Sequence, residues 1–299
     1  MHGVSTRKVD ELVKALGMGG ISKSRVSELC EELDEEVERF GNRPLEGSYP
    51  YVWVDATYVK ARQDGRVVSA AVVDRRGGEG ADRRKGGFGD GRGSQRGRRL
   101  LEIVLAFVGR PGALWGEALV TSDAHRGLKS AVGAVLVGAS WQRCRVHFMR
   151  NALSLVPRAA QQMVGATIRT VFAQQPDTVG AREQWRRVSD GFRSGFPRLA
   201  CLMDEAEEDV LAYSAFPSEH WQKIWSNNPL ERLNKEVKRR TNVVGIFPTE
   251  GSVIRLVGAV LCEQHDEWQV SKRYFSAGSL AKLERKEEAV IEQPELMAG

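Results

Sequence analysis

Ten residues at positions 51–60, YVWVDATYVK, constrain the fold of this chain more than any other segment. They are rich in β-branched and aromatic side chains, so we predict a strand that is buried on both faces of a sheet. A second strand is predicted from Arg66 to Val73, after a turn at residues 63–65. The short turn between two such strands predicts an antiparallel hairpin.

Helical periodicity dominates most of the remaining sequence. A third strand, at residues 117–124, precedes a predicted helix at residues 125–137. Residues 141–225 then have a helical period that is interrupted by four prolines, and the next helix begins at Asn228-Pro229. A last amphipathic helix is predicted at about residues 252–268. This order predicts a helical block that is inserted after a strand region.

The composition excludes several classes of protein. Of the 299 residues, 41% are hydrophobic and 28% are charged, which is typical of a folded globular protein and not of a disordered or collagen-like chain. No apolar run approaches the roughly 20 residues of a membrane-spanning helix. The four cysteines, at positions 30, 144, 201 and 262, have no paired spacing, which favours a reducing compartment. We expect a soluble, cytoplasmic protein without membrane contact.

The net charge of +5 comes from one segment that is rich in glycine and arginine. Residues 75–99 contain nine of the 44 basic residues but only three of the 39 acidic ones, so the rest of the chain is close to neutral. Bulk charge is therefore weak evidence for a nucleic-acid partner. The nine glycines of this segment, without any apolar periodicity, predict that it does not fold as part of a core.

The N-terminal residues have the pattern of a partial helix-turn-helix region. One helix is predicted after Ser5 and a second after Ser22, with glycines between them. A DNA-reading helix contacts bases through its first residues, so Lys23 and Arg25 are candidate DNA ligands. The inward side chains of the second helix are predicted to be Val26, Leu29, Cys30 and Leu33. The alternative is an ordinary helical hairpin.

Three carboxylates stand out by their positions: Asp55 inside a strand, Asp123 at the end of a strand, and Glu231 in the first turn of a helix that Asn228 would cap. Each has a structural alternative. Asp55 could accept hydrogen bonds from backbone amides, Asp123 could cap the next helix, and Glu231 could be the acid of a capping box.

Taken together, two aspartates on strands and a later glutamate on a helix have the order found in ribonuclease-H-like nucleases. Three carboxylates can hold two divalent ions roughly 3.5–4 Å apart for in-line phosphoryl transfer. Oxygen ligands favour Mg²⁺, with Mn²⁺ as a substitute. We predict an α/β fold (α+β, helix-rich), with a ribonuclease-H-like core that an all-α insertion interrupts and a partial helix-turn-helix region that precedes it.

The helix of Glu231 also has a basic stripe. Its members are Arg232, Lys235, Lys238, Arg239 and Arg240. A solvated helix face is the ordinary explanation of such a stripe. Beside a metal site, the same stripe would bind DNA phosphates.

Four motifs carry a specific family resemblance. They are DATYVK at residues 55–60, SDAHRGLK at residues 122–129, WQRCRVHFMRN at residues 141–151 and WSNNPLERLNKEVKRRT at residues 225–241. Together with GIFP from residue 245 and EQHDEW from residue 263, they resemble the Mutator-type transposases of bacterial insertion sequences. The resemblance covers about residues 2–73 and 118–275.

The resemblance implies a DDE transposase with Asp55, Asp123 and Glu231 as its catalytic triad and metal ligands. Its partners would be the terminal repeats of an insertion element and target DNA, and it would act as a homo-oligomer on paired ends. The family's Cys-x-x-His signature falls on Cys144 and His147.

Other residues near these motifs have weaker assignments. We interpret His147 as a neighbour of the active site and Cys144 as a packing residue, because two ligands make at most half of a zinc site. His125, directly after Asp123, is a second candidate neighbour. The tryptophans at positions 221 and 225 could stack on an unpaired base, although core packing is expected for at least one of them.

These patterns predict five regions. Residues 1–43 form the partial DNA-binding region, and residues 44–140 form the first part of the core, with an atypical segment at residues 74–117. Residues 141–226 form the all-α insertion, residues 227–275 carry the C-terminal core helices with Glu231, and residues 276–299 form a charged tail that is expected to fray.

Two departures from the family pattern bear on activity. The chain begins inside the region where family members carry a longer DNA-binding part, so recognition of terminal repeats would be weakened. Residues 74–117 match nothing in the family, and two compensating frameshifts near Val73 and Leu119 would explain them; a genuine Gly/Arg-rich DNA-binding loop is the alternative. The sequence therefore predicts a transposase whose present copy could be inactive. The rival functions are a non-catalytic DNA-binding fragment and a general ribonuclease-H-like nuclease.

Overall fold

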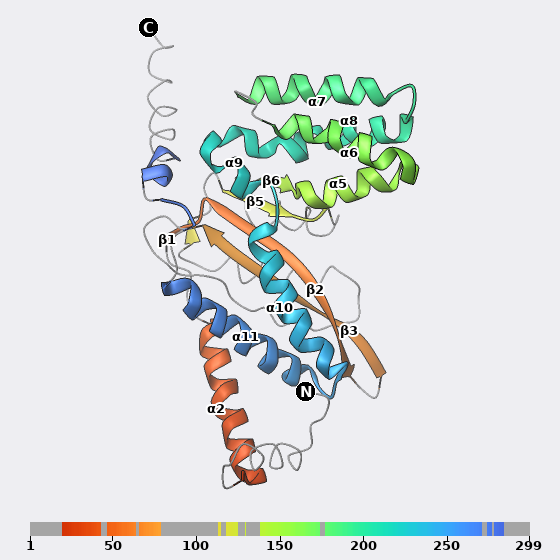
Figure 1. The fold of residues 1–299 in the computed structure, drawn as a ribbon. Coiled ribbons are helices and arrows are strands. Elements are labelled where there is room, and N and C mark those ends of the chain that lie inside the picture. The colour runs from red at the N-terminus through yellow and green to blue at the C-terminus, as the bar shows by residue number, and fades with distance from the viewer. Residues whose placement is uncertain are drawn as a thin grey trace.

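The computed structural model describes residues 20–42, 47–63, 66–78, 113–114, 118–124, 129, 138–173, 177–270, 274–276 and 278–283. These residues form a helix-rich α/β protein with two small sheets (Figure 1). The α/β fold class is thus confirmed, whereas the ribonuclease-H-like core and the helix-turn-helix region stay predictions. No helix in this part of the chain is both long and apolar enough to cross a membrane.

The main sheet is built on the predicted hairpin, which the structure confirms. Its strands are β2 (Tyr51–Gln63), β3 (Arg66–Gly78), β5 (Leu119–Ser122), β6 (Ser140–Arg143) and β7 (Ile246–Phe247). β3 pairs antiparallel with β2, and β5 followed by β6 extends the sheet in parallel on the other side of β2. β7 pairs with the second half of β2. A separate parallel pair joins β1 (Gly47–Ser48) to β4 (Ala113–Leu114).

Three details of the sheet differ from the sequence predictions. β3 continues past Val73 to Gly78, because it pairs with β2 along the whole strand. β6 takes up residues 141–143, where the sequence predicts a helix. β2 is buried on both faces only in its first half: beyond Asp55, Val59 and Ala61 remain buried, but Tyr58 is 65% exposed. Among the described residues, α-helices pack on only one face of the sheet at this end, and Tyr58 lies on the other face.

The helical block follows β6. Its helices are α5 (Arg145–Ser154), α6 (Gln161–Arg169), α7 (Thr178–Phe192), α8 (Pro197–Leu211) and α9 (Trp221–Ile224), linked in part by short 3₁₀ turns. Trp185 is fully buried between α5, α7 and α8. Its ring lies 5.2 Å from that of Phe148, and its Nε1 donates to the carbonyl oxygen of Met203 at 3.0 Å. The block therefore has an aromatic core of its own.

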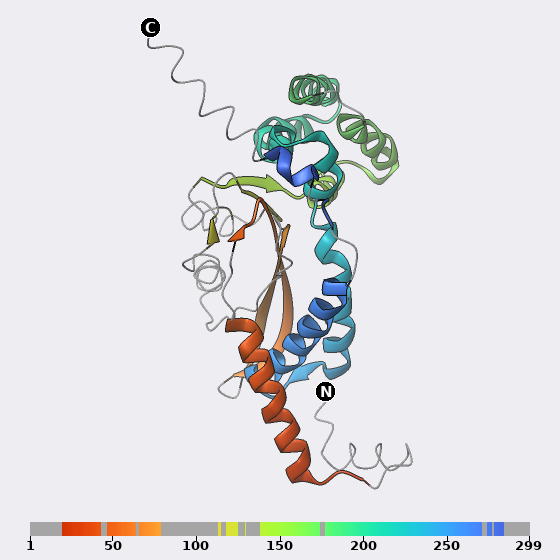
Figure 2. The same ribbon diagram turned by 90° about the vertical axis from the view of Figure 1, so that its left-hand side faces the viewer.

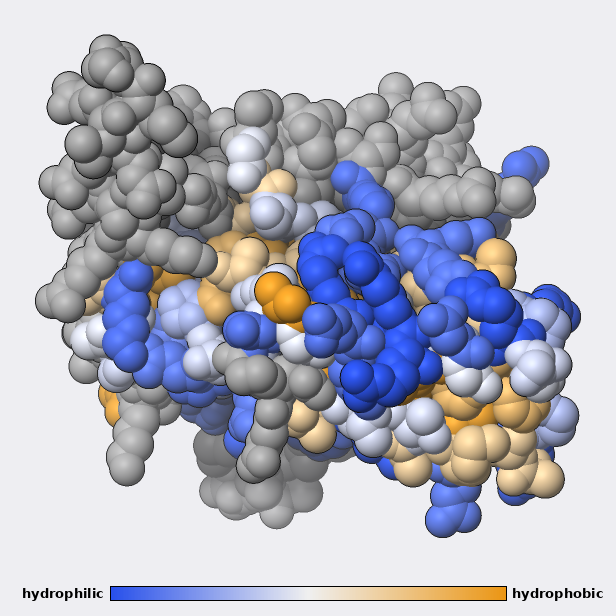
Figure 3. Space-filling model, turned by 90° about the horizontal axis from the view of Figure 1, so that it is seen from above, coloured by the Kyte–Doolittle hydropathy of each residue, from blue (hydrophilic) through white to orange (hydrophobic). Residues whose placement is uncertain are grey.

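Ion pairs join α7 and α8 on the outside of this block. Arg186 contacts Glu207 at 2.8 Å, Arg193 contacts Asp204 at 2.9 Å, and the Nη2 of Arg182 donates to Glu208 at 2.6 Å. Seen from above, the described surface is largely hydrophilic, with apolar residues in smaller patches (Figure 3).

Two C-terminal helices cover one face of the hairpin. They are α10 (Asn228–Val244) and α11 (Glu250–Val270), and they lie on the same side of β2 and β3 (Figure 2). α10 ends at Gly245, whose φ of 72° is readily adopted only by glycine, and β7 follows at once. The face of α10 toward the sheet is apolar, with Leu230, Leu233 and Val237 almost fully buried.

The N-terminal helix α2 (Lys23–Asn42) packs on α11. Ser22 caps α2 as predicted, because its Oγ accepts a hydrogen bond from the backbone N–H of Arg25 at 3.1 Å. The predicted inward position of Leu29 is wrong: this side chain is 41% exposed, since the contact with α11 lies farther along the helix, where Val37 is buried. The first predicted helix, after Ser5, lies outside the described residues.

The contact between α2 and α11 depends on a glycine. A Cβ at Gly258 would lie 2.8 Å from Cγ2 of Val37, with Cγ1 closer still. We predict that Gly258→Ala destabilises the docking of α2 by about 1–3 kcal/mol, because overpacking outweighs the gain in helix propensity. Hydrogen exchange of α2 amides measures this effect. Adding Val37→Ala should restore protection in part, and equal protection in wild type and Gly258→Ala would contradict the prediction.

The segment after α11 returns to the sheet. The Phe275 ring lies 5.0 Å from Tyr51 and 4.8 Å from His220, and Lys223 Nζ donates to the carbonyl oxygen of Tyr274 at 2.6 Å. Residues 278–283 are helical, and Lys282 pairs with Glu219 at 2.9 Å. The predicted fraying therefore does not apply to this part of the tail, and residues 284–299 lie outside the described range.

Candidate active site

Asp55 and Asp123 lie at the same level of two neighbouring parallel strands. Trp53 of β2 pairs with Thr121 of β5, and each aspartate follows two residues later. Because side chains two residues apart in a strand point to the same face, the register brings the two carboxylates to one side of the sheet. Both side chains are half-buried.

The two aspartates have different local partners. Oδ2 of Asp55 accepts a hydrogen bond from the side-chain Nδ2 of Asn234 at 2.6 Å. Oδ1 of Asp123 accepts from the backbone N–H of Ala124 at 2.6 Å. The helix that Asp123 could cap, together with His125, lies outside the described residues.

The helix α10 turns Glu231 toward this level of the sheet. Asn227, Glu231 and Asn234 are separated by four and three residues, the spacing of one helix face. Nδ2 of Asn227 donates to the carbonyl oxygen of Val54 at 3.1 Å, and Asn234 contacts Asp55. Glu231 therefore lies on the helix face between two contacts to β2. Its half-buried carboxylate makes no hydrogen bond or ion pair with any side chain that the structure describes.

A capping role does not explain Glu231. The residue that caps α10 is Asn227, one position before the predicted Asn228, and its side chain makes no capping bond. A capping-box glutamate accepts from the backbone N–H of this residue. In the structure that N–H donates to Sγ of Cys144 at 3.3 Å. The carboxylate of Glu231 is left available for another ligand.

Cys144 and His147 lie at the start of α5, next to the aspartates. Cys144 is buried, as expected of a packing residue, and also ties the beginning of α10 to α5. The pKa of His147 is raised: its interaction with the Cys144 side chain is the largest cause, and the negative charges of Asp123 and Asp55 add to it against the effect of burial. His147 thus lies within electrostatic reach of both aspartates, and its role as a neighbour of the active site stays a prediction.

Sequence reasoning did not find Arg143, although it lies close to Asp123. Burial lowers the pKa of the Arg143 guanidinium, while the charges of Asp123 and Asp209 act in the opposite direction. Its position near Asp123 could be predicted only by recognising β6. The sequence does not reveal this strand, because its residues lie within a stretch that has a helical period. Thr57, Asn227 and Asn234 were missed too, but the last two have a signal in the sequence: an asparagine lies on the same helix face on each side of Glu231.

The two tryptophans before α10 are core residues. Trp221 and Trp225 are each 8% exposed, and the ring of Tyr213 makes edge contacts with both. The Arg145 guanidinium lies 4.2 Å from the centre of the Trp225 ring. Neither tryptophan presents a free face to an unpaired base, so the suggested stacking role is wrong for this arrangement.

The predicted DNA-binding residues of α10 fall into two groups. Arg239 and Arg240 both contact Glu236, at 2.6 and 2.7 Å, and Arg240 also reaches Glu263 of α11 at 3.0 Å. The two guanidinium groups lower the pKa of Glu236 to about 2. By contrast, three basic side chains form no ion pair with the residues that the structure describes. They are Arg232, Lys235 and Lys238.

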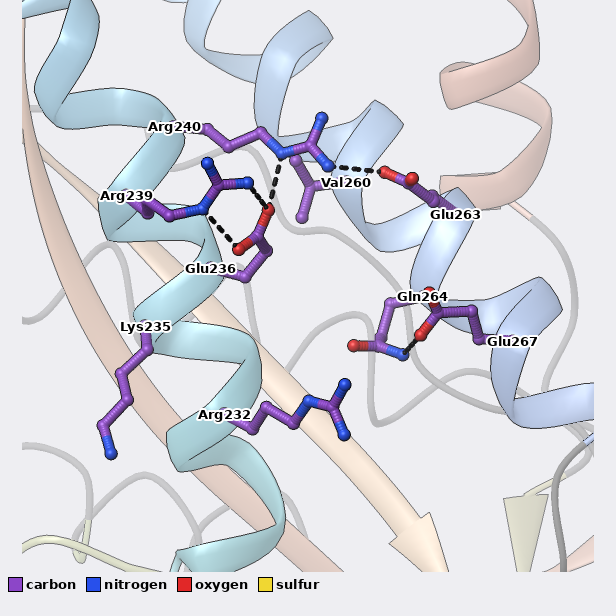
Figure 4. Close-up of a pocket in the computed structure, with 9 residues that line it drawn as sticks. All are labelled: Arg232, Lys235, Glu236, Arg239, Arg240, Val260, Glu263, Gln264 and Glu267. Atoms are coloured by element: carbon purple, nitrogen blue, oxygen red, sulfur yellow. Dashed lines mark hydrogen bonds and ion pairs between the residues drawn. The ribbon is translucent and has the colours of Figure 1, made fainter.

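A groove of about 280 Å³ lies between α10 and α11 (Figure 4). Arg232 and Lys235 line one end of this groove, and the ion pairs of Arg239 and Arg240 lie at the other end. Acids of both helices neutralise Arg239 and Arg240, so within the groove Arg232 and Lys235 are the basic side chains without an ion pair to a described residue.

The two predicted DNA-binding residues of α2 also differ in their ion pairing. Lys23 is exposed, whereas Arg25 contacts Glu28 at 2.9 Å and Glu32 at 3.4 Å. These pairs raise the pKa of Arg25, mainly through its hydrogen bond with Glu28. Of the two residues, Lys23 has the more available charge.

The donor chemistry of Asp55, Asp123 and Glu231 suits a hard divalent cation, since all three ligands are carboxylates. However, no three His, Cys, Asp or Glu side chains within the described ranges come close enough together to hold a metal ion. The strand register places Asp55 and Asp123 at one level of the sheet. The face of α10 that carries Glu231 lies toward them, but the three carboxylates do not form a three-ligand cluster.

Comparisons with known proteins agree with the resemblance of the motifs. The family model described as "Transposase, Mutator family" matches residues 1–271. The transposase for insertion sequence element IS1081 of Mycobacterium tuberculosis is 44% identical over 294 residues, which cover 94% of this chain and 67% of that protein. The transposase for IS256 in transposon Tn4001 of Staphylococcus aureus is 36% identical over 285 residues, with 92% of this chain and 70% of that protein covered. The transposase for ISRM5 of Rhizobium meliloti is 35% identical over 280 residues.

Proposed function

Because the chain belongs to the Mutator family of transposases, we propose that it cleaves DNA at the ends of an insertion element and joins them to target DNA. Asp55, Asp123 and Glu231 are the carboxylates proposed for this reaction. One observation carries their assignment: the register of β2 and β5 puts both aspartates at one level, and α10 is held against that level on both sides of Glu231. The antiparallel hairpin, the parallel strands beside it and the helical block after β6 also support a ribonuclease-H-like core.

The three carboxylates would hold Mg²⁺, or Mn²⁺ in its place, and the ions would activate the attacking oxygen and steady the leaving oxygen. Since the described side chains do not yet form a three-ligand group, closure of the site is proposed to accompany binding of metal and DNA. His147 and Arg143 would add positive charge beside the aspartates, where the phosphate of the substrate has to lie.

DNA is the proposed partner of the basic stripe, and its unpaired members carry the contact. Arg232, Lys235 and Lys238 can neutralise phosphates without first losing a protein partner among the described residues. Binding of terminal repeats and target DNA, and assembly as a homo-oligomer on paired ends, belong to the same proposal. Family membership and the transposase relatives support DNA as the partner, and the homo-oligomer rests on the resemblance of the motifs alone.

The salt dependence of DNA affinity tests whether the unpaired basic residues of α10 contribute more to DNA binding than the ion-paired ones. We predict that combined alanine substitution of Arg232, Lys235 and Lys238 lowers the slope of log affinity against log salt concentration by roughly 2–3, since each phosphate contact contributes roughly 0.9. Arg239→Ala, the matched control, should change the slope little, because Arg239 is already paired with Glu236. Equal effects of the two variants on the slope would contradict the prediction.

The second candidate is that the chain is a non-catalytic DNA-binding fragment. This candidate is favoured because no three potential metal ligands among the described residues lie close enough together to hold an ion. An assay of plasmid nicking with Mn²⁺ separates the candidates. The transposase proposal predicts metal-dependent nicking of a plasmid that carries the element's ends. Binding without nicking would support the non-catalytic fragment, and equal nicking of a plasmid without ends would support a general nuclease.

A further inference from the structure

Asn234 is a buried amide whose two polar ends both have partners. It is 6% exposed and lies where α10 crosses β2. Its Nδ2 donates to Oδ2 of Asp55 at 2.6 Å, and its Oδ1 accepts from Oγ1 of Thr57 at 3.0 Å. Thr57 is 2% exposed and follows Asp55 by two residues on the same face of β2. The three side chains form a buried chain of hydrogen bonds from Thr57 through Asn234 to Asp55.

The partners also determine which way round the amide lies. If it were turned over, its oxygen would face the carboxylate of Asp55 and two acceptors would meet without a proton between them. The carboxylate of Asp55, which can only accept, therefore sets the orientation of the amide. The Thr57 hydroxyl, which can donate or accept, donates to the amide oxygen and holds the amide in place. Thr57 thus acts on Asp55 through Asn234.

A second asparagine holds the same helix to the same strand. Asn227, 1% exposed, donates to the carbonyl oxygen of Val54, the residue before Asp55. Asn227 and Asn234 are two helical turns apart, and Glu231 lies between them. The two contacts fix how far α10 can slide along β2, and therefore where Glu231 stands relative to Asp55.

We propose that Asn234, held by Thr57, is a positioning residue of the active site. It fixes the direction of the Asp55 carboxylate and, together with Asn227, the register of the helix that carries Glu231. Apolar neighbours on α10 already supply packing, and a buried amide adds stability only where its hydrogen bonds are made. The inference rests on the proposed function, because it assigns Asn234 to the carboxylates of that reaction.

The first test compares variants in single-turnover nicking of an end-bearing plasmid over a range of Mn²⁺ concentrations. Asn234→Ala and Thr57→Val are expected to lower the maximal rate, on the order of 10²-fold for Asn234→Ala, because a small misplacement of a reacting group is costly. Both should also need more Mn²⁺ for half-maximal rate. Thr57→Ser, which keeps the hydroxyl, should recover most of the activity.

The matched control is Thr241→Val. Thr241 is a buried residue of the same helix, 4% exposed, and its hydroxyl donates only to the carbonyl oxygen of Lys238 among the described groups. Its loss is expected to lower the thermal midpoint about as much as Thr57→Val while leaving the Mn²⁺ requirement unchanged. If Thr57→Val behaves like Thr241→Val in every readout, the inference is overturned. It also fails if Asn234→Ala nicks at the wild-type rate while Asp55→Ala does not nick.

A double variant tests the order of the chain of contacts. Because Thr57 is proposed to act through Asn234, adding Thr57→Val to Asn234→Ala should cost little further activity. If the two substitutions instead lower the nicking rate independently, so that their fold-losses multiply, Thr57 does not act through Asn234.

A second readout does not depend on activity. In ¹⁵N-labelled protein, the side-chain NH₂ protons of Asn234 should exchange slowly with solvent and lose protection in Asp55→Ala and in Thr57→Val. If the wild type nicks no DNA but these protons behave as expected, the proposed function fails while the contact between Asn234 and Asp55 stands. Unprotected Asn234 protons in the wild type would overturn the positioning inference even if the protein is an active transposase.

Discussion

Replacing Asp55, Asp123 or Glu231 by its amide is expected to lower metal-dependent nicking by at least about 10³-fold, as is usual for groups that act directly on the reacting atoms. Each substitution removes a negative charge but keeps the shape of the side chain. Asp55→Asn can still accept the hydrogen bond from Asn234, and Glu231 has no described side-chain partner to lose. The folded structure should therefore persist, and the loss should be specific to chemistry. Rates of plasmid nicking and circular dichroism of the same samples measure the two effects.

The matched control is Asp266→Asn on α11, because Asp266 is exposed and has no ion pair with a described residue. It should nick at the wild-type rate. The three amide variants should retain salt-sensitive DNA binding, since the basic residues of α10 are unchanged. A variant at Glu231 that keeps full activity would remove this residue from the site and leave the two aspartates without their proposed third partner.

Trp185→Ala is expected to destabilise the helical block by about 3–5 kcal/mol, the largest stability effect that we predict. The side chain is fully buried, its ring contacts Phe148, and its Nε1 donates to the carbonyl oxygen of Met203. Truncation would leave a cavity between α5, α7 and α8 and an acceptor without its donor. Unfolding in denaturant, followed by circular dichroism, gives the change in free energy.

Val179→Ala is the control on the same helix, because Val179 is 63% exposed. Its effect should stay within about 0.5 kcal/mol. A loss below about 1 kcal/mol for Trp185→Ala would mean that the packing around this ring is not the core of the block. Because α5 follows β6 directly, a strong loss in Trp185→Ala should also weaken DNA nicking through the position of His147.

The sequence predicts the elements whose patterns are long and regular. The hairpin of β2 and β3 follows from β-branched and aromatic residues on both sides of a short turn, and α10 follows from its proline, its apolar face and its basic stripe. The end of β3 cannot be read in this way, because pairing with the full length of β2 sets it. β6 has only four residues between helical patterns, too few for periodicity to reveal.

The candidate site likewise depends partly on local sequence patterns and partly on contacts between residues that are far apart in the chain. The carboxylates could be selected from the sequence, but the adjacency of Asp55 and Asp123 depends on a strand register that only the fold supplies. The pairing of Arg240 with Glu263 likewise joins two helices. Glu236, by contrast, lies three and four residues before Arg239 and Arg240, so this pairing could have been predicted from helix spacing alone.

For most of residues 74–117, the interpretation of the sequence stays a prediction. Its first residues belong to β3 and residues 113–114 form β4, while the part between them lies outside the described residues. The proposed frameshifts and the alternative of a DNA-binding loop are both still open to a test by resequencing the encoding DNA.

The most direct test of the central claim is a crystal structure of the protein soaked with Mn²⁺, with anomalous scattering used to locate the ion. The account predicts a peak that is bound directly by carboxylate oxygens of both Asp55 and Asp123, with Glu231 drawn into the site when DNA is present. Metal held elsewhere, for example by Cys144 and His147, or an absence of metal at saturating Mn²⁺, would contradict the assignment of these carboxylates.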